Sequence, residues 1–246
     1  MKKIIPPIFI AALLLSISCK KSDIYKSIDG CPVDSSISTN YLNDAKEIVY
    51  SRILSGDHVS DSNQPIFNQQ ELDRVLSAIQ SVYALHSAQT DSIFNIYQIH
   101  AFRRYLLNSV ILQVDINAPE IKNLTKGNPS GNVLFDDFLA KYGFSYNTAF
   151  PPGATLPFIN FTTNTWYNLQ AILPVFKSFP FILGAQADGS AGDGNNITYR
   201  LNGNQRIIDF SFGYGDCPAG CIGRSTWEFN VDENCRASFV KFSVTP

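Results

Sequence analysis

Five cysteines carry the clearest chemistry in this chain of 246 residues. The first, Cys19, follows two lysines near the start, a short apolar run from Ile8 to Leu15, and small residues. A basic start, an apolar core too short to span a bilayer and small residues before a cut are typical of a secretory signal peptide. A cysteine directly after the cut is the expected site of lipidation. We therefore expect residues 1–18 to be a lipoprotein signal peptide and Cys19 to carry the acyl anchor.

Lipidation would hold the protein on the periplasmic or outer face of a cell envelope without a transmembrane segment. The alternative is an ordinary signal peptide with a cysteine near its end, which would release a soluble secreted protein. Ser16 and Ser18 stand where the preferred lipobox has leucine and then glycine or alanine, a relaxed pattern that resembles lipoproteins of the Bacteroidota. Lys20 is not an inner-membrane retention signal of the Asp type. By resemblance to other Gram-negative lipoproteins, we expect the outer membrane.

The other four cysteines are an even number in a compartment that permits disulfides, so we expect two bridges. Cys217 and Cys221 lie in one loop between predicted strands, and Cys235 lies in the next loop. The intervening strand spans roughly 20 Å, whereas bridged Cα atoms lie within about 7 Å. We therefore predict that Cys217 pairs with Cys221 and that Cys31 pairs with Cys235. Redox chemistry at the first pair is disfavoured, because thioredoxin-like sites have two intervening residues rather than three.

The Gly-rich segment 189–196 is a weak calcium candidate, because Asp188, Asp193 and Asn195 could supply oxygen ligands. The same residue types build plain hairpin connections, and we favour that interpretation. The three histidines are scattered, and no pair has the spacing of zinc ligands on one element. We therefore expect no cofactor. The histidines are His58, His86 and His100.

Hydrolase and nucleic-acid signals are missing from the sequence. There is no Gly-x-Ser-x-Gly, no His-Glu-x-x-His and no Walker loop. The paired acids Asp136-Asp137 and Asp232-Glu233 are interpreted as solvated charges on a helix and a hairpin. The formal net charge of −2 becomes about −4 when Lys2 and Lys3 leave with the signal peptide. No basic cluster could neutralise phosphates, so we exclude nucleic-acid binding.

Two early helices are indicated by apolar residues at helical spacing, over about residues 42–53 and 72–83. Asn40 and Asn68 are their predicted N-caps. Gly56 suits the position just after the first helix. Both helices are amphipathic, so each needs an apolar partner.

The middle of the chain is less regular. A third helix is predicted over about 134–142, ending at Gly143, and a fourth near 165–173 is cut by Pro174. Two further segments are rich in aromatic and β-branched residues and are predicted strands. They are residues 93–99 and 110–114.

From about residue 181 onward the hydrophobic period is two. Four strands follow, with Asn202-Gly203 as a hairpin signal between the first two. This pattern predicts an antiparallel meander with one wet face, covered on the other by the upstream helices. The predicted class is α+β, with amphipathic helices packed on a C-terminal antiparallel β-meander. Residues 19–38 would be a lipidated polar tether and 39–246 a single domain, with an optional sub-boundary near 127–131.

The segment Gly215-Asp216-Cys217-Pro218-Ala219-Gly220-Cys221, followed by Trp227, resembles a motif in uncharacterised secreted proteins and lipoproteins of the Bacteroidota. The resemblance covers less than a tenth of the chain. It implies an envelope protein and supplies no catalytic residues.

We therefore expect a lipid-anchored, non-enzymatic envelope module that binds an envelope protein, a peptide or a glycan. One alternative is a secreted hydrolase acting on polysaccharide or peptide, which perturbed carboxylates in a cleft would favour. Another is an inhibitor of the cystatin type, by analogy of one helix wrapped by a meander. A shallow apolar patch would favour binding.

Overall fold

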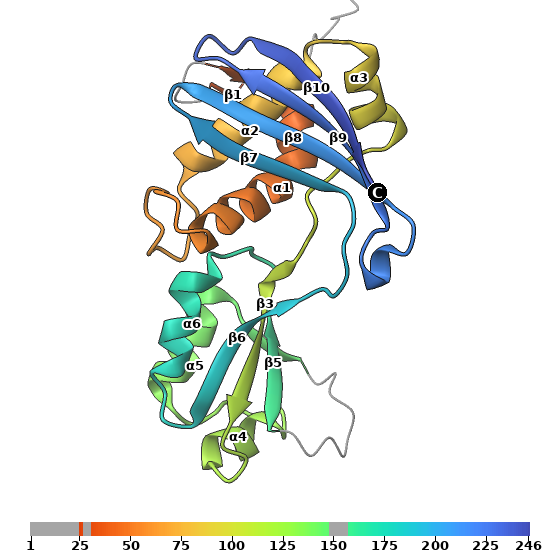
Figure 1. The fold of residues 1–246 in the computed structure, drawn as a ribbon. Helices are drawn as coiled ribbons and strands as arrows, with labels where there is room; N and C mark the ends of the chain where they lie inside the picture. The colour runs from red at the N-terminus through yellow and green to blue at the C-terminus, as the bar shows by residue number, and fades with distance from the viewer. Residues whose placement is uncertain (1–24, 27–30, 148–156) are drawn as a thin grey trace, which may run out of the picture.

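The computed structural model describes residues 25–26, 31–147 and 157–246. The predicted signal peptide and Cys19 lie outside these residues. Among the described helices, none is long and apolar enough to cross a membrane. Two antiparallel four-stranded sheets and several helices give the predicted α+β class, arranged as an upper and a lower lobe (Figure 1).

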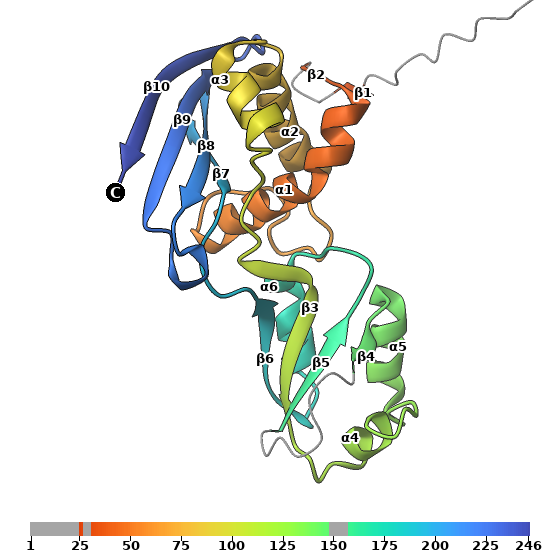
Figure 2. The same ribbon diagram turned by 90° about the vertical axis from the view of Figure 1, so that its right-hand side faces the viewer.

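The upper lobe contains the predicted meander in the order β10-β9-β8-β7. Two long helices lie across its inner face, and a short helical segment follows them (Figure 2). The strands are β7 (Asn196–Asn202), β8 (Gln205–Tyr214), β9 (Gly223–Val231) and β10 (Ala237–Thr245). The helices are α1 (Ser35–Leu54), α2 (Gln69–Tyr83), α3 (Ala88–Asp91) and the π-helix η1 (Ser92–Ile96), and the short strands β1 (Tyr25–Lys26) and β2 (Pro32–Val33) pair beside them.

The lower lobe is inserted between η1 and β7. Its sheet has the order β4-β5-β3-β6, and Figures 1 and 2 show α5 and α6 on one side of this sheet. Residues 127–131, the optional sub-boundary, fall inside this lobe between two helices. The strands are β3 (Tyr105–Val114), β4 (Ser145–Asn147), β5 (Phe158–Thr162) and β6 (Ile182–Gly189), and the helices are α4 (Pro119–Leu124), α5 (Val133–Tyr142) and α6 (Leu169–Lys177).

The two faces of the meander differ as the alternation predicts. Phe210 and Phe229 are fully buried against the helices. On the opposite face, Arg200 pairs with Asp209 on β8 and Glu228 on β9. The β7–β8 turn has positive φ at Gly203, the first of its two central residues, as a type II′ turn requires. One wet and one buried face are therefore confirmed.

Several helix ends are confirmed. The side chain of Asn68 accepts hydrogen bonds from the amides of Gln70 and Glu71 and so caps α2. Gly56 follows α1 with a φ of 78°, and Gly143 ends α5 with a φ of 66°. Only glycine adopts this left-handed conformation without steric cost.

Three predicted boundaries are wrong. α1 begins at Ser35 rather than after Asn40, because Ile37 is buried and extends the apolar face. Residues 35–38, assigned to the tether, are therefore helical. The predicted fourth helix is shifted to Leu169–Lys177 and continues past Pro174, because Leu169, Ile172 and Phe176 are all buried along it.

Residues 93–99, predicted as a strand, form η1 and the turn that follows. The helical start is set upstream, where Ser87 and Thr90 form a reciprocal capping box. The backbone hydrogen bonds settle the assignment, because the amide of Tyr97 donates to the carbonyl of Ser92, the five-residue spacing of a π-helix. The β-branched composition of this segment was misleading because local capping and tertiary packing outweigh propensity.

Both predicted disulfides are present. Cys31 bonds to Cys235 with Cα atoms 5.6 Å apart, which ties the start of α1 to the β9–β10 loop. Cys217 bonds to Cys221 within the loop between β8 and β9. The meander places these two loops at opposite ends of the sheet, which is the reason for the pairing.

Candidate functional site

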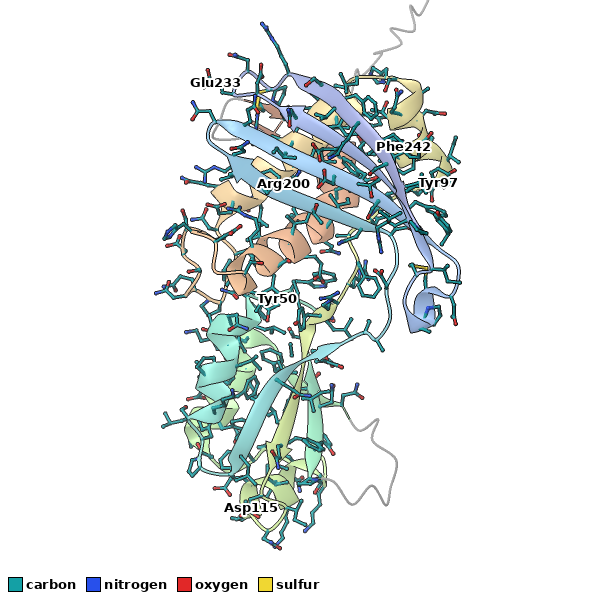
Figure 3. All side chains as sticks on the ribbon, viewed as in Figure 1. Tyr50, Tyr97, Asp115, Arg200, Glu233 and Phe242 are labelled. Carbon is teal, nitrogen blue, oxygen red and sulfur yellow. A yellow bond between two sulfur atoms is a disulfide. The ribbon has the colours of Figure 1, made fainter. Side chains whose placement is uncertain are left out.

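A cavity of about 410 Å³ lies where α1 passes β7, and we call it the α1–β7 cavity. Glu47, Ser51 and Ser55 line it from one face of α1, because residues four apart on a helix are neighbours. Residues 196–200 of β7 and four residues of the segment that leads into the lower lobe form the other walls; these four are Ala101, Phe102, Arg104 and Tyr105. In Figure 3, Tyr50 lies where α1 meets the lower lobe, and Arg200 lies on β7. The volume falls in the range of small-molecule and peptide sites.

Glu47 is the most unusual lining residue. Its side chain is buried, with the residue only 6% exposed, and its Oε1 atom has no hydrogen-bond partner. Burial raises the pKa of Glu47 to about 8; nearby Arg103 opposes this shift, and Asp44 adds to it. The carboxyl group is therefore mostly protonated at neutral pH. It can donate a hydrogen bond to a ligand, and at slightly higher pH it loses its proton and can pair with a cation.

Tyr199 supplies a second unpartnered group from the opposite wall. The residue is 5% exposed, and its hydroxyl has no hydrogen-bond partner. Burial raises the pKa of this hydroxyl to about 12. Glu47 and Tyr199 both line the cavity. Buried polar atoms are nearly always hydrogen-bonded, so two lining residues with unpartnered atoms indicate a place that a ligand or water completes.

A buried ion-pair network closes the cavity beside Tyr199. The guanidinium of Arg52 lies 3.0 Å from Glu71 Oε2 and 3.4 Å from Asp57 Oδ2. The other oxygen of Glu71 lies 2.9 Å from Arg74. The charge of Arg52 is thus balanced within the protein, and its guanidinium lies 5.4 Å from the centre of the Tyr199 ring. This network positions the wall and is not free to bind a charged ligand.

Hydrogen bonds also hold residues 100–105, the connector from η1 to the lower lobe, which forms the remaining wall. Asp44 on α1 accepts from the backbone amide of Ala101, and its other oxygen lies 3.0 Å from His100 Nδ1. This hydrogen bond raises the pKa of His100, and partial burial opposes the shift. The side chain of Asn196 accepts from the amide of Phe102 at 3.0 Å. The connector is therefore tied to both α1 and β7.

Asp193, a residue of the calcium candidate, also lines the cavity. A hydrogen bond from Arg224, with N and O atoms 2.6 Å apart, lowers the pKa of Asp193 below its usual value. The cavity thus combines an ionised carboxylate with the protonated carboxyl of Glu47. Environments that separate two carboxyl pKa values in this way are common in catalytic and binding sites.

The other two calcium candidates are engaged elsewhere. Asp188 accepts from Ser109 Oγ at 2.8 Å in the lower lobe, and Asn195 accepts from the amide of Gly213 at 3.2 Å. Within the described ranges, no three histidine, cysteine or acidic side chains form a group that could hold a metal ion. These three oxygen-bearing side chains each serve protein donors.

The sequence motifs did not indicate Glu47 or Tyr199. The available signal was a glutamate beside the apolar residues Ile48 and Val49 of an amphipathic helix. Comparison with protein-family models, curated proteins and solved structures found no match for this chain. The assignment of a site therefore rests on the geometry of the cavity.

Proposed function

We propose that this protein is a lipid-anchored cell-envelope module, held in the outer membrane through Cys19, that binds a ligand in the α1–β7 cavity. The signal-like segment and Cys19 support the anchor. The observation that carries the binding role is that two residues lining one cavity, Glu47 and Tyr199, each have a buried polar atom without a hydrogen-bond partner.

The anchor is tested by growing cells with a labelled fatty acid. We expect the label on the wild-type protein and none on a Cys19→Ala variant, which would also leave the membrane fraction. Label on neither protein would contradict the anchor and favour a soluble secreted form.

The binding role is tested on the purified mature chain by screening peptides and oligosaccharides for a rise in melting temperature, because a ligand that binds only the native state stabilises it. Glu47→Met and the exposed Glu233→Met are matched variants, because methionine has a similar length and lacks the carboxyl oxygens. We expect a ligand that stabilises wild type and Glu233→Met but has a much smaller effect on Glu47→Met. Ligands that stabilise all three proteins equally would place the binding site elsewhere.

A second candidate function, hydrolysis of a glycan, is favoured by the two carboxyl groups of opposite pKa shift, Glu47 and Asp193. A protonated acid and an ionised carboxylate are the usual groups of glycoside hydrolysis. The test is reducing-end release from polysaccharides by wild type, Glu47→Gln and Asp193→Asn. Loss of release in both variants would support an enzyme, and no release by wild type on any polysaccharide would oppose it.

A further inference from the structure

The cavity lies along a strand edge rather than on a sheet face. β7 is at the end of its sheet, with β8 as its neighbour on one side. Consecutive strand residues point to opposite faces, yet five consecutive residues, 196–200, line the cavity. A cavity that touches both faces must pass along the edge. The α1–β7 cavity therefore exposes the backbone of β7 to a ligand.

The register identifies which backbone groups are open. Asn202 pairs with Gln205 across a two-residue turn, so this closing pair is hydrogen-bonded, and hydrogen-bonded pairs recur at every second residue. Ile197, Tyr199 and Leu201 then direct their N–H and C=O groups away from β8. In the part of the chain that the structure describes, these groups make no backbone hydrogen bond outside the ladder.

The two sheet edges are not equivalent. The β9–β10 pairing is interrupted by a bulge between Phe239 and Lys241, and Lys241 lies on the strand itself. Bulges and edge lysines are features that discourage strand addition. The β7–β8 pairing is regular over all seven residues of β7. The charged side chain on β7, Arg200, is held over the sheet by Asp209 and Glu228.

The dimensions of the cavity suit an extended chain. Residues 196–200 run for roughly 15 Å at about 3.3 Å per residue. The opposing face of α1, from Glu47 to Ser55, runs for roughly 12 Å at about 1.5 Å per residue. A peptide segment of about four residues matches both walls. Its backbone would meet the open groups of β7, and alternate side chains would point toward α1.

We propose that the α1–β7 cavity binds an extended peptide of a partner protein, which adds a strand to β7 and places a hydrogen-bond-donating side chain against Glu47. This inference rests on the proposed binding function and names its ligand class. An added strand supplies the backbone partners that Ile197 and Tyr199 lack, and the donor supplies the partner that Glu47 Oε1 lacks. A glycan is the competing occupant, and the test distinguishes the two.

The probe is a phage-displayed library of linear 12-residue peptides, selected on the mature protein, with a glycan array in parallel. The best selected peptide is then synthesised with each backbone amide methylated in turn. Methylation removes one donor without altering the protein. We expect affinity to fall at alternate amides of a central segment, by about fivefold or more at each, the effect of one net hydrogen bond.

Matched variants locate the contact on the protein. Ile197→Pro removes an outward N–H group, whereas Ile197→Ala keeps it, and proline is tolerated at an edge strand whose N–H is not in the ladder. We expect the peptide to bind Ile197→Pro at least about fivefold more weakly than Ile197→Ala. Hydrogen exchange followed by NMR should show slower exchange of the Ile197 and Tyr199 amides when the peptide is bound.

The outcomes separate this inference from the proposed function. A peptide whose binding needs Glu47 but shows no alternating methylation effect would overturn strand addition and leave the cavity as the ligand site. If glycans bind in a Glu47-dependent manner and no peptide binds, strand addition is likewise overturned and the cavity remains the ligand site. If neither library yields a Glu47-dependent ligand, both the inference and the proposed function fail.

Discussion

Replacing Glu47 with glutamine should stabilise the protein by an amount that grows with pH. The ordinary pKa of this carboxyl is 4.5, and burial raises it to about 8 in the fold. Between these values the unfolded chain has released its proton while the native state retains it. The native state therefore loses stability as pH rises from about 4.5 to 8, because it must keep a proton that the unfolded chain has already released.

The size of this effect follows from the difference of about 3.5 pKa units. Each unit corresponds to about 1.4 kcal/mol. Relative to its value at pH 4, the stability difference between Glu47→Gln and wild type should grow by about 3 kcal/mol at pH 7 and about 5 kcal/mol at pH 9. Glutamine has nearly the same shape and does not ionise, so it removes this dependence.

The assay is urea unfolding of both proteins at intervals from pH 4 to pH 9. Other titrating groups are common to the two proteins, so they cancel in the difference. Glu233→Gln, on the exposed β9–β10 loop, is the control and should run parallel to wild type. Parallel curves for Glu47→Gln and wild type would refute the buried, protonated state of Glu47.

Two further predictions concern the framework around the cavity. Replacing both Cys31 and Cys235 with serine should lower the free energy of unfolding by about 5 kcal/mol, and replacing both Cys217 and Cys221 should lower it by about 2 kcal/mol. The difference is expected because the two bridges span 204 and 4 residues. Urea unfolding measures both losses, and equal losses would contradict this explanation. Glu71→Leu should lower the free energy of unfolding by about 3 kcal/mol, because it leaves the buried Arg52 with the half-exposed Asp57 as its remaining acidic partner. Adding Arg52→Met should recover much of that loss, measured by thermal unfolding, and no recovery would contradict the ion-pair explanation.

The upper sheet was predictable because its information is local. The alternation of residues such as Ile208 and Phe210 predicts the strand, and the hairpin at Gly203 predicts its register. The cysteine pairing followed from the same alternation, since successive meander loops lie at opposite ends. The helix after Ser87 was missed although its capping box was in the sequence, because the apolar composition of residues 93–99 received more weight.

The site was not predictable in the same way. Glu47 lies on α1, but the cavity that it lines is completed by Phe102 and Tyr105, more than fifty residues later, and by β7, about 150 residues later. No local pattern records how those segments converge. Tyr199 is a buried residue of β7, but only the folded structure shows that its hydroxyl lacks a hydrogen-bond partner.

The insertion of the lower lobe explains how such a site arises. The chain leaves the upper lobe through residues 101–105 and returns through 190–195 into β7, so both connectors pass beside the same strand edge. The bond between Asn196 and the Phe102 amide joins the outgoing segment to the start of β7. The amide of Asp193 donates to the carbonyl of Cys217, which fixes the returning segment 190–195 against the loop that holds the Cys217–Cys221 disulfide. An uninterrupted helix-and-meander fold would have no connectors here to form these walls, so the insertion creates a lined cavity at an otherwise open edge.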